Sequence, residues 1–131
     1  MKTHILFTTD KFNSTEVKEN FINDRCFGED LIAWLIDELH ADDLVFDGPF
    51  QEDWGWATLV RSKGEMIVIS GGIMDESIGK SPADWLLSVE KMKRFFFFGS
   101  TDSELRKTLE SKVETILSNA SDIANVRRES W

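Results

Sequence analysis

Two apolar-rich runs, residues 54–62 and 65–70, are separated only by Lys63-Gly64, and this arrangement restricts the possible folds of the chain more than any other feature. A two-residue connection that contains glycine suits the tight turn of a β-hairpin, because glycine readily adopts positive φ angles. A hairpin joins antiparallel strands. The sequence therefore predicts an antiparallel sheet in which these two runs are neighbouring strands.

Shorter apolar segments predict further strands on either side of this hairpin. The first is residues 5–8, whose apolar run is too short for a signal peptide or a membrane span. Leu44-Val45-Phe46 predicts another strand, ended by the turn-forming pair Gly48-Pro49. Residues 84–90 alternate between apolar and polar side chains, which indicates a strand with one buried face. Residues 123–131 are compatible with either an edge strand or a frayed tail.

Two segments have the apolar spacing of amphipathic helices. In the first, residues 28–41, leucines recur at every fourth position from Leu31 to Leu39. The second helix is predicted to follow Thr101-Asp102-Ser103-Glu104, which has the spacing of a capping box that begins at Thr101. The stretches 10–19 and 71–82 lack such periodicity and are predicted to be loops.

The order of these elements is strand, helix, four strands, helix. Short connections between consecutive strands favour antiparallel pairing, and two amphipathic helices can cover one face of a sheet. We therefore predict an α+β fold for a single domain of residues 1–131, with an antiparallel sheet of about 4–6 strands and two helices packed on one face. A chain of 131 residues can bury such a core without a disulfide or a metal ion.

Acidic side chains outnumber basic ones by 24 to 15, which gives a formal net charge of −9. This charge repels nucleic-acid backbones and acidic lipids, so neither a nucleic acid nor a membrane is an expected partner. It attracts basic proteins, although solubility alone also accounts for it. Cys26 is the only cysteine and forms no intramolecular disulfide, which predicts a cytoplasmic location.

Two carboxylates followed by two tryptophans form the main candidate site: Glu52, Asp53, Trp54 and Trp56. Indoles spaced by two residues lie on the same face of a strand, so this segment would place aromatic surface beside acidic groups. An alternative is an enzyme that uses Glu52 and Asp53 as general acid and base in a Trp-lined pocket. In a third, structural interpretation the acids end a loop and the tryptophans pack on a helix.

Four consecutive aromatic residues form a second candidate contact segment. They are Phe95, Phe96, Phe97 and Phe98. On a strand, two of the rings would face the core, and the other two would be exposed unless a helix, another subunit or a partner covered them. Core packing of most of the rings is the alternative. An apolar patch of this kind, or an uncovered edge strand, would also support a homodimer.

The sequence carries no recognisable cofactor, metal-binding or catalytic signature. Gly79-Lys80-Ser81 resembles the end of a phosphate-binding loop, but Met74 occupies the position where that motif requires a glycine. His4, His40 and Cys26 are widely separated and show no ligand spacing. We therefore expect no cofactor, no metal and no assigned catalytic residue, while a Cys–His pair formed only on folding stays an open alternative.

The segment Glu52-Asp53-Trp54-Gly55-Trp56, together with Trp34-Leu35 and Trp85, resembles a group of small uncharacterised bacterial α+β proteins. The resemblance covers most of the chain in element order and implies no activity. The residues themselves favour a noncatalytic protein-binding domain of an adaptor or toxin-neutralising type. Its predicted contacts are the Trp54/Trp56 surface and residues 95–98, and its partner is a protein, with a basic one as the specific hypothesis.

Overall fold

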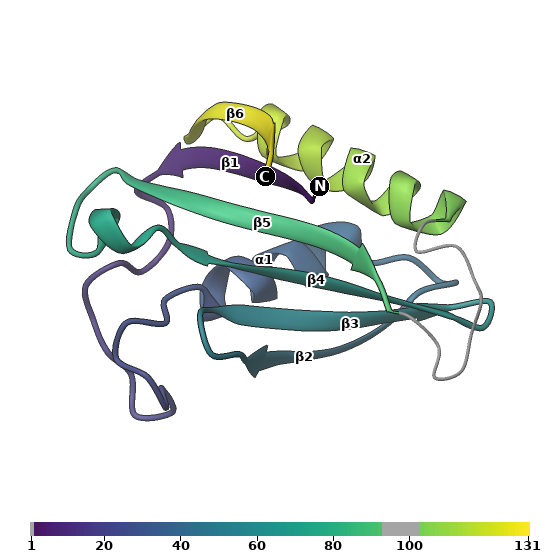
Figure 1. The fold of residues 1–131 in the computed structure, drawn as a ribbon, viewed down its shortest axis with the longest axis horizontal. Helices are drawn as coiled ribbons and strands as arrows, with labels where there is room; N and C mark the ends of the chain where they lie inside the picture. The colour runs from purple at the N-terminus through teal and green to yellow at the C-terminus, as the bar shows by residue number, and fades with distance from the viewer. Residues whose placement is uncertain (1, 93–102) are drawn as a thin grey trace.

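A computed structural model of the chain describes residues 2–92 and 103–131. Within these residues, six strands form one sheet and two α-helices pack against it (Figure 1). The elements in chain order are β1 (Thr3–Thr9), α1 (Glu29–Leu39), β2 (Val45–Gln51), β3 (Trp56–Ser62), β4 (Glu65–Ile73), a 3₁₀ turn (Asp75–Ser77), β5 (Ala83–Lys91), α2 (Glu104–Asn119) and β6 (Ile123–Ser130).

The sheet has the strand order β2-β3-β4-β5-β1-β6, and every pair of neighbours is antiparallel. β3 and β4 form the predicted hairpin, in which Ser62 pairs with Glu65. The two turn residues, Lys63 and Gly64, have φ angles of 52° and 79°, as expected for a two-residue hairpin turn with positive φ at both positions. The hairpin prediction is confirmed.

One face of the sheet carries the hydrophobic core. Alternate side chains of β4 and β5, including Ile67, Ile69, Trp85 and Leu87, are fully buried there. α1 contacts β2, β3 and β4, α2 contacts β5 and β6, and the two helices contact each other. Leucines of both helices join the same core cluster. The predicted α+β fold, with two helices on one face of an antiparallel sheet, is confirmed.

The helix boundaries differ in part from those predicted. α1 lies within the predicted range 28–41 and buries the apolar side of the helix. α2 begins at Glu104, later than a capping box starting at Thr101 would require. Ser103 is the N-cap, because its backbone is extended and its hydroxyl accepts a hydrogen bond from the backbone N–H of Arg106. A serine closer to the apolar stripe thus satisfies one of the free N–H groups at the helix start.

Two strands are longer than predicted. A third decides between the two alternatives left open for residues 123–131, an edge strand and a frayed tail. β2 does not end at Gly48-Pro49 but continues to Gln51, with a shift of the pairing register between Asp47 and Phe50. An irregularity in an edge strand accommodates proline, because its missing N–H need not contribute to the ladder. β4 extends through Gly71 to Ile73. The tail forms β6, an edge strand paired with β1.

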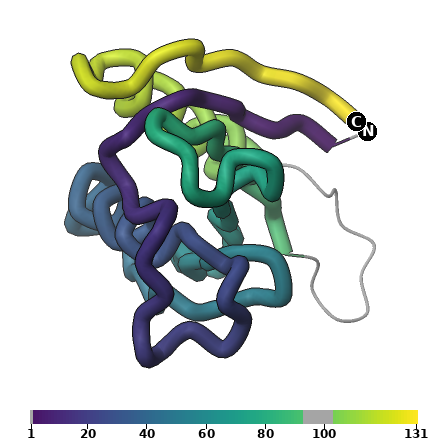
Figure 2. Tube along the Cα trace, turned by 90° about the vertical axis from the view of Figure 1, so that its left-hand side faces the viewer, coloured from purple at the N-terminus to yellow at the C-terminus, as the bar shows by residue number. Residues whose placement is uncertain are grey.

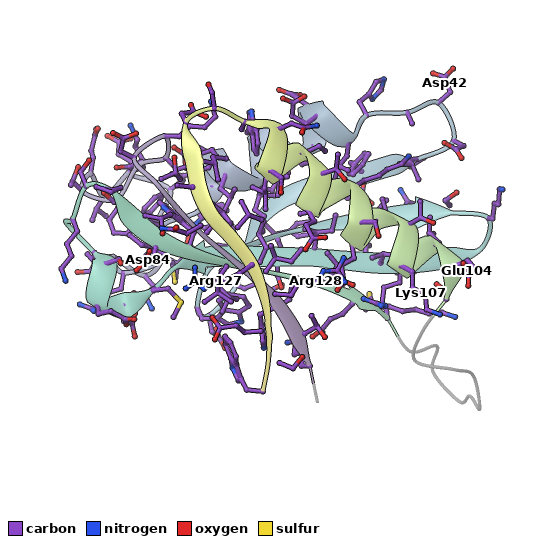
Figure 3. The ribbon with its side chains drawn as sticks, turned by 90° about the horizontal axis from the view of Figure 1, so that it is seen from above. Asp42, Asp84, Glu104, Lys107, Arg127 and Arg128 are labelled. Carbon is purple, nitrogen blue, oxygen red and sulfur yellow. The ribbon has the colours of Figure 1, made fainter. Side chains whose placement is uncertain are left out.

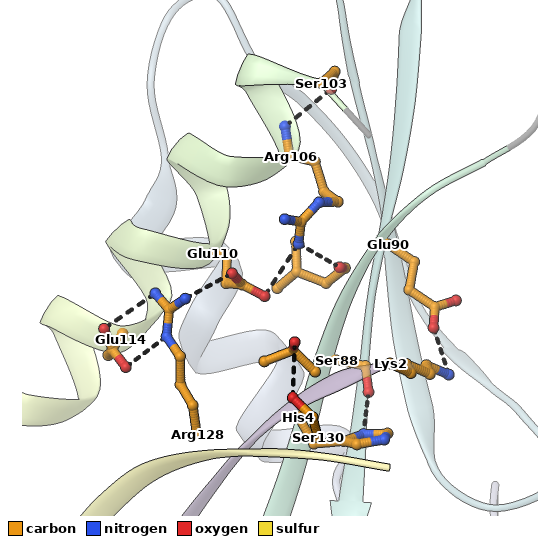
Figure 4. Close-up of polar contacts among 12 residues, drawn as sticks. Lys2, His4, Ser88, Glu90, Ser103, Arg106, Glu110, Glu114, Arg128 and Ser130 are labelled. Atoms are coloured by element: carbon orange, nitrogen blue, oxygen red, sulfur yellow. Dashed lines mark hydrogen bonds and ion pairs between the residues drawn. The ribbon is translucent and has the colours of Figure 1, made fainter. Parts of the chain in front are cut away.

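A network of charged side chains attaches α2 to the sheet. Glu110 is 5% exposed and accepts hydrogen bonds from Arg106 (3.1 Å) on its own helix and from Arg128 (2.9 Å) on β6 (Figure 4). Arg128 also donates two bonds to Glu114, of 2.8 and 3.2 Å, which raise the pKa of the guanidinium. Arg106 donates a further bond to the carbonyl oxygen of Val89 on β5. The network therefore connects α2 with both β5 and β6.

Candidate protein-binding surface

The connection between β2 and β3 is a tight turn formed by residues 52–55. The backbone N–H of Glu52 donates a hydrogen bond of 2.8 Å to the carbonyl oxygen of Gly55. A Cβ atom at Gly55 would overlap the carbonyl oxygen of Gly71 on β4, so only glycine permits this close approach of two backbones. The turn is thereby fixed at one end of the sheet.

A loop from the N-terminal part of the chain lies against this turn. The backbone N–H of Ile22 donates to the side-chain oxygen of Gln51 (2.8 Å), and the side-chain amide of Asn23 donates to the carbonyl oxygen of Asp53 (3.5 Å). The thiol of Cys26 donates to the same carbonyl oxygen at 3.3 Å. Hydrogen bonds therefore hold residues 22–26 against the turn.

Trp56 is not part of that surface, which corrects the prediction that both indoles share an accessible face. It is 3% exposed and belongs to the hydrophobic core. Its indole N–H donates a hydrogen bond of 2.7 Å to the carbonyl oxygen of Cys26, and its ring lies 5.6 Å from that of Phe21. β3 begins only at Trp56, so Trp54 lies in the turn and does not follow the strand alternation. Trp56 holds the loop in place.

The other predicted side chains of this segment are exposed. Trp54 is 47% exposed and Ile22 is 90% exposed, so two large apolar side chains face solvent on the turn and the loop beside it. Glu52 and Asp53 are exposed in the same turn, and Asp24 is exposed in the adjacent loop. We call these five residues, Ile22, Asp24, Glu52, Asp53 and Trp54, the turn surface. Ile22 and Asp24 were not predicted, because nothing in the local sequence indicates that this loop folds onto a turn about 30 residues away.

This geometry does not favour the chemistry of the enzyme alternative. That alternative places one of the two carboxylates in a Trp-lined pocket, whereas Glu52 and Asp53 are both exposed at a hairpin turn. Burial, followed by the charges of Asp53 and Asp75, raises the pKa of the nearby Cys26 thiol. The thiol is therefore protonated at neutral pH, unlike an activated nucleophile.

The second predicted contact segment, Phe95 to Phe98, lies outside the described residues. A separate groove of about 660 Å³ lies between the C-terminal end of α1 and the outer face of α2. Leu39 and Ile116 supply apolar side chains to it, and Lys107 and Lys112 supply positive charge. None of the predicted site residues of the 52–56 segment, Glu52, Asp53, Trp54 and Trp56, lines this groove.

A polar cluster lies on the sheet face opposite the helices. Nδ1 of His4 is 2.9 Å from the hydroxyl oxygen of Ser88 (Figure 4). The indole of Trp131 stacks on the imidazole with the ring centres 4.0 Å apart. Lys2 forms an ion pair with Glu90 beside them. Burial first and the charge of Lys2 second lower the pKa of His4, which favours the neutral imidazole.

We expect the free energy of unfolding to decrease as the pH falls through about 6.5, the ordinary pKa of histidine. Because the pKa of His4 is lowered in the folded protein, the unfolded chain binds its proton at a higher pH. The stability contributed by neutral His4 is fully present above about pH 6.5 and is lost below it, until folded His4 is itself protonated. Urea unfolding from about pH 8 to 5 measures the slope. The variant His4→Gln should flatten it, and an unchanged slope would contradict the assignment to His4.

The described residues contain no group of three or more His, Cys, Asp or Glu side chains that could hold a metal ion. Among the helices in 2–92 and 103–131, none has the length and apolar character needed to cross a membrane. The resemblance suggested by the Glu52-Asp53-Trp54-Gly55-Trp56 segment stays a prediction. Comparison with protein-family models, with curated proteins and with solved structures finds no match to this chain.

Proposed function

We propose that this chain is a protein-binding domain and that the turn surface is its contact site. The observation that carries the proposal is the exposure of two large apolar side chains, Ile22 and Trp54, on backbone segments joined by hydrogen bonds. Exposed tryptophan is costly in water, and tryptophan is enriched among the residues that contribute most to protein interfaces. An adaptor or a protein that neutralises a toxin would use such a surface.

The contacts that hold the loop and the turn in place favour binding of a partner with little rearrangement of the turn surface. The loop is held by Trp56 and by the Ile22–Gln51 bond, and the turn is held by the close approach of Gly55 to β4. A preorganised surface loses less conformational entropy on binding than a mobile one. Trp54 can therefore act as a fixed anchor for a partner.

Replacing Trp54 with alanine should weaken partner binding about 30-fold or more, because removal of a central aromatic anchor costs about 2 kcal/mol or more. The matched control is Trp131→Ala, which removes another exposed tryptophan (56%) from the other end of the strand order, beside β1 and β6. Each protein is used to capture partners from a lysate of the cells that make it. The affinity of the captured protein for each variant is then measured by calorimetry.

The two variants distinguish binding at a specific site from nonspecific binding to any exposed tryptophan. Loss of binding in Trp54→Ala with retention in Trp131→Ala supports the turn surface as the contact site. Equal affinity of Trp54→Ala and the wild type would overturn it. Sedimentation of the isolated protein at several concentrations tests the homodimer hypothesis, and a dimer lost on Trp54→Ala would identify the partner as a second copy of the chain.

A further inference from the structure

The negative charge of the chain is concentrated in one third of its sequence. Residues 10–53 contain 13 of the 24 acidic side chains but only 3 of the 15 basic ones. This stretch therefore carries a net charge of −10, and the remaining residues carry +1. The formal charge of −9 is thus not spread evenly along the chain. An even distribution would be expected if the charge served solubility alone.

The acidic stretch also lies together in space. It comprises the long loop after β1, α1 and β2, and β2 is one edge of the sheet. Figure 2 shows these purple-to-blue segments in the lower part of the molecule, whereas β6 lies at the top. In Figure 3, Asp42 lies at one end of the molecule, far from Arg127 and Arg128 on β6. The protein therefore has an acidic side at the β2 edge.

Carboxylates of the turn surface differ in their partners from those on the α2 and β6 side. On the α2 and β6 side, Glu110 and Glu114 are paired with arginine, and Glu129 is paired with Arg127. At the turn surface, no Lys or Arg of the described residues forms an ion pair with Asp24, Glu52 or Asp53. These three carboxylates are exposed in the same hydrogen-bonded loop and turn as Trp54 and Ile22. The apolar contact is thus bordered by unneutralised negative charge.

From this arrangement we infer that the partner of the turn surface is a basic protein, whose Lys or Arg side chains pair with Asp24, Glu52 and Asp53 around an apolar contact with Trp54 and Ile22. The inference rests on the proposed function and specifies the chemistry of the partner. The remaining charge of residues 10–53 attracts such a partner over longer distances and increases its association rate. Opposite charges at the border of an interface also exclude acidic competitors.

A defined peptide pair tests the charge of the partner directly. The probe is a 20-residue peptide rich in Lys and Arg with a central Leu, and its control has every Lys and Arg replaced by Gln. Binding is followed by two-dimensional ¹H–¹⁵N NMR, which reports the indole N–H of Trp54 and the backbone of residues 22–24 and 52–54. We expect the basic peptide to shift these signals and to bind more weakly as salt rises from about 50 to 200 mM. The Gln peptide should not bind.

Two triple variants with the same change in net charge test whether the basic peptide binds at the turn surface. Asp24→Asn/Glu52→Gln/Asp53→Asn removes the carboxylates of the turn surface. It should lower the affinity for the basic peptide about tenfold at low salt, because three exposed ion pairs are lost together. Glu104→Gln/Asp122→Asn/Glu129→Gln removes three exposed carboxylates elsewhere and should change the affinity less than about twofold. Equal weakening by both variants would overturn the inference, because the peptide would then sense only the overall charge.

The same measurements separate failure of the inference from failure of the proposed function. If the Gln peptide shifts the Trp54 signals as strongly as the basic peptide does, and Trp54→Ala abolishes those shifts, the turn surface binds protein but the basic partner is wrong. If Trp54→Ala changes neither peptide binding nor partner capture, the proposed function itself is wrong.

Discussion

Replacing Glu110 with alanine should lower the free energy of unfolding by about 3 kcal/mol, because this change removes the buried centre of an ion-pair network. Glu110 is 5% exposed and accepts hydrogen bonds from both Arg106 and Arg128. Its loss takes a carboxylate partner away from the largely buried guanidinium of Arg106, which also donates to the carbonyl oxygen of Val89 on β5. Arg128 keeps Glu114, which places the effect at the lower end of the usual range for a broken buried pair.

Glu114→Ala is the matched control for this prediction, since it removes a carboxylate from the same helix and the same arginine. The side chains of Glu114 and Arg128 are 36% and 38% exposed, and pairs exposed to this extent contribute about 1 kcal/mol or less. Urea unfolding of both variants measures the difference. If Glu110→Ala costs no more than Glu114→Ala, burial of the network contributes nothing to stability, and α2 is attached to the sheet by its apolar face alone.

Local sequence patterns were sufficient to predict most of the elements and the fold class. The Lys63-Gly64 turn fixes its own hairpin, because a two-residue connection leaves few backbone conformations and only antiparallel pairing. The leucines of α1 and α2 each form one stripe, and burial of both stripes requires them to share one face of the sheet. These predictions succeed because the interactions that decide them lie within a few residues of each other.

Predictions that depended on long-range contacts were less successful. β2 continues past Gly48-Pro49 because β3 supplies its pairing partners, which local turn propensity does not reveal. The exposure of Ile22 depends on where Gln51 and Asp53 lie after folding. The sequence prediction therefore missed two of the five residues of the turn surface, Ile22 and Asp24.

The different roles of Trp54 and Trp56 are the clearest case of this limit. Spacing by two residues predicts one shared face only while both residues belong to a strand. The turn at 52–55 ends that regularity, since its closing hydrogen bond from Glu52 to Gly55 places Trp54 outside β3. One indole is consequently exposed on the turn surface, and the other supports the loop from inside the core.

Trp56→Ala should lower the free energy of unfolding by about 3–5 kcal/mol, the usual cost of truncating a buried tryptophan. The side chain is 3% exposed, packs against Phe21 and bonds the carbonyl oxygen of Cys26. A small domain has a total stability of only about 5–15 kcal/mol, so urea unfolding should show a large decrease in the midpoint. Trp54→Ala, in contrast, should leave the midpoint nearly unchanged because its side chain is half exposed.

A second substitution at the same position separates support of the loop from contact with a partner. Trp56→Phe keeps an aromatic ring in the core but removes the N–H that bonds Cys26, so it should cost less stability than alanine while leaving a buried carbonyl unpaired. Below its unfolding transition this variant should retain most of the partner affinity that Trp54→Ala loses. If Trp56→Phe abolished binding while remaining folded by circular dichroism, Trp56 would contact the partner directly, and the division of roles between the two tryptophans would be wrong.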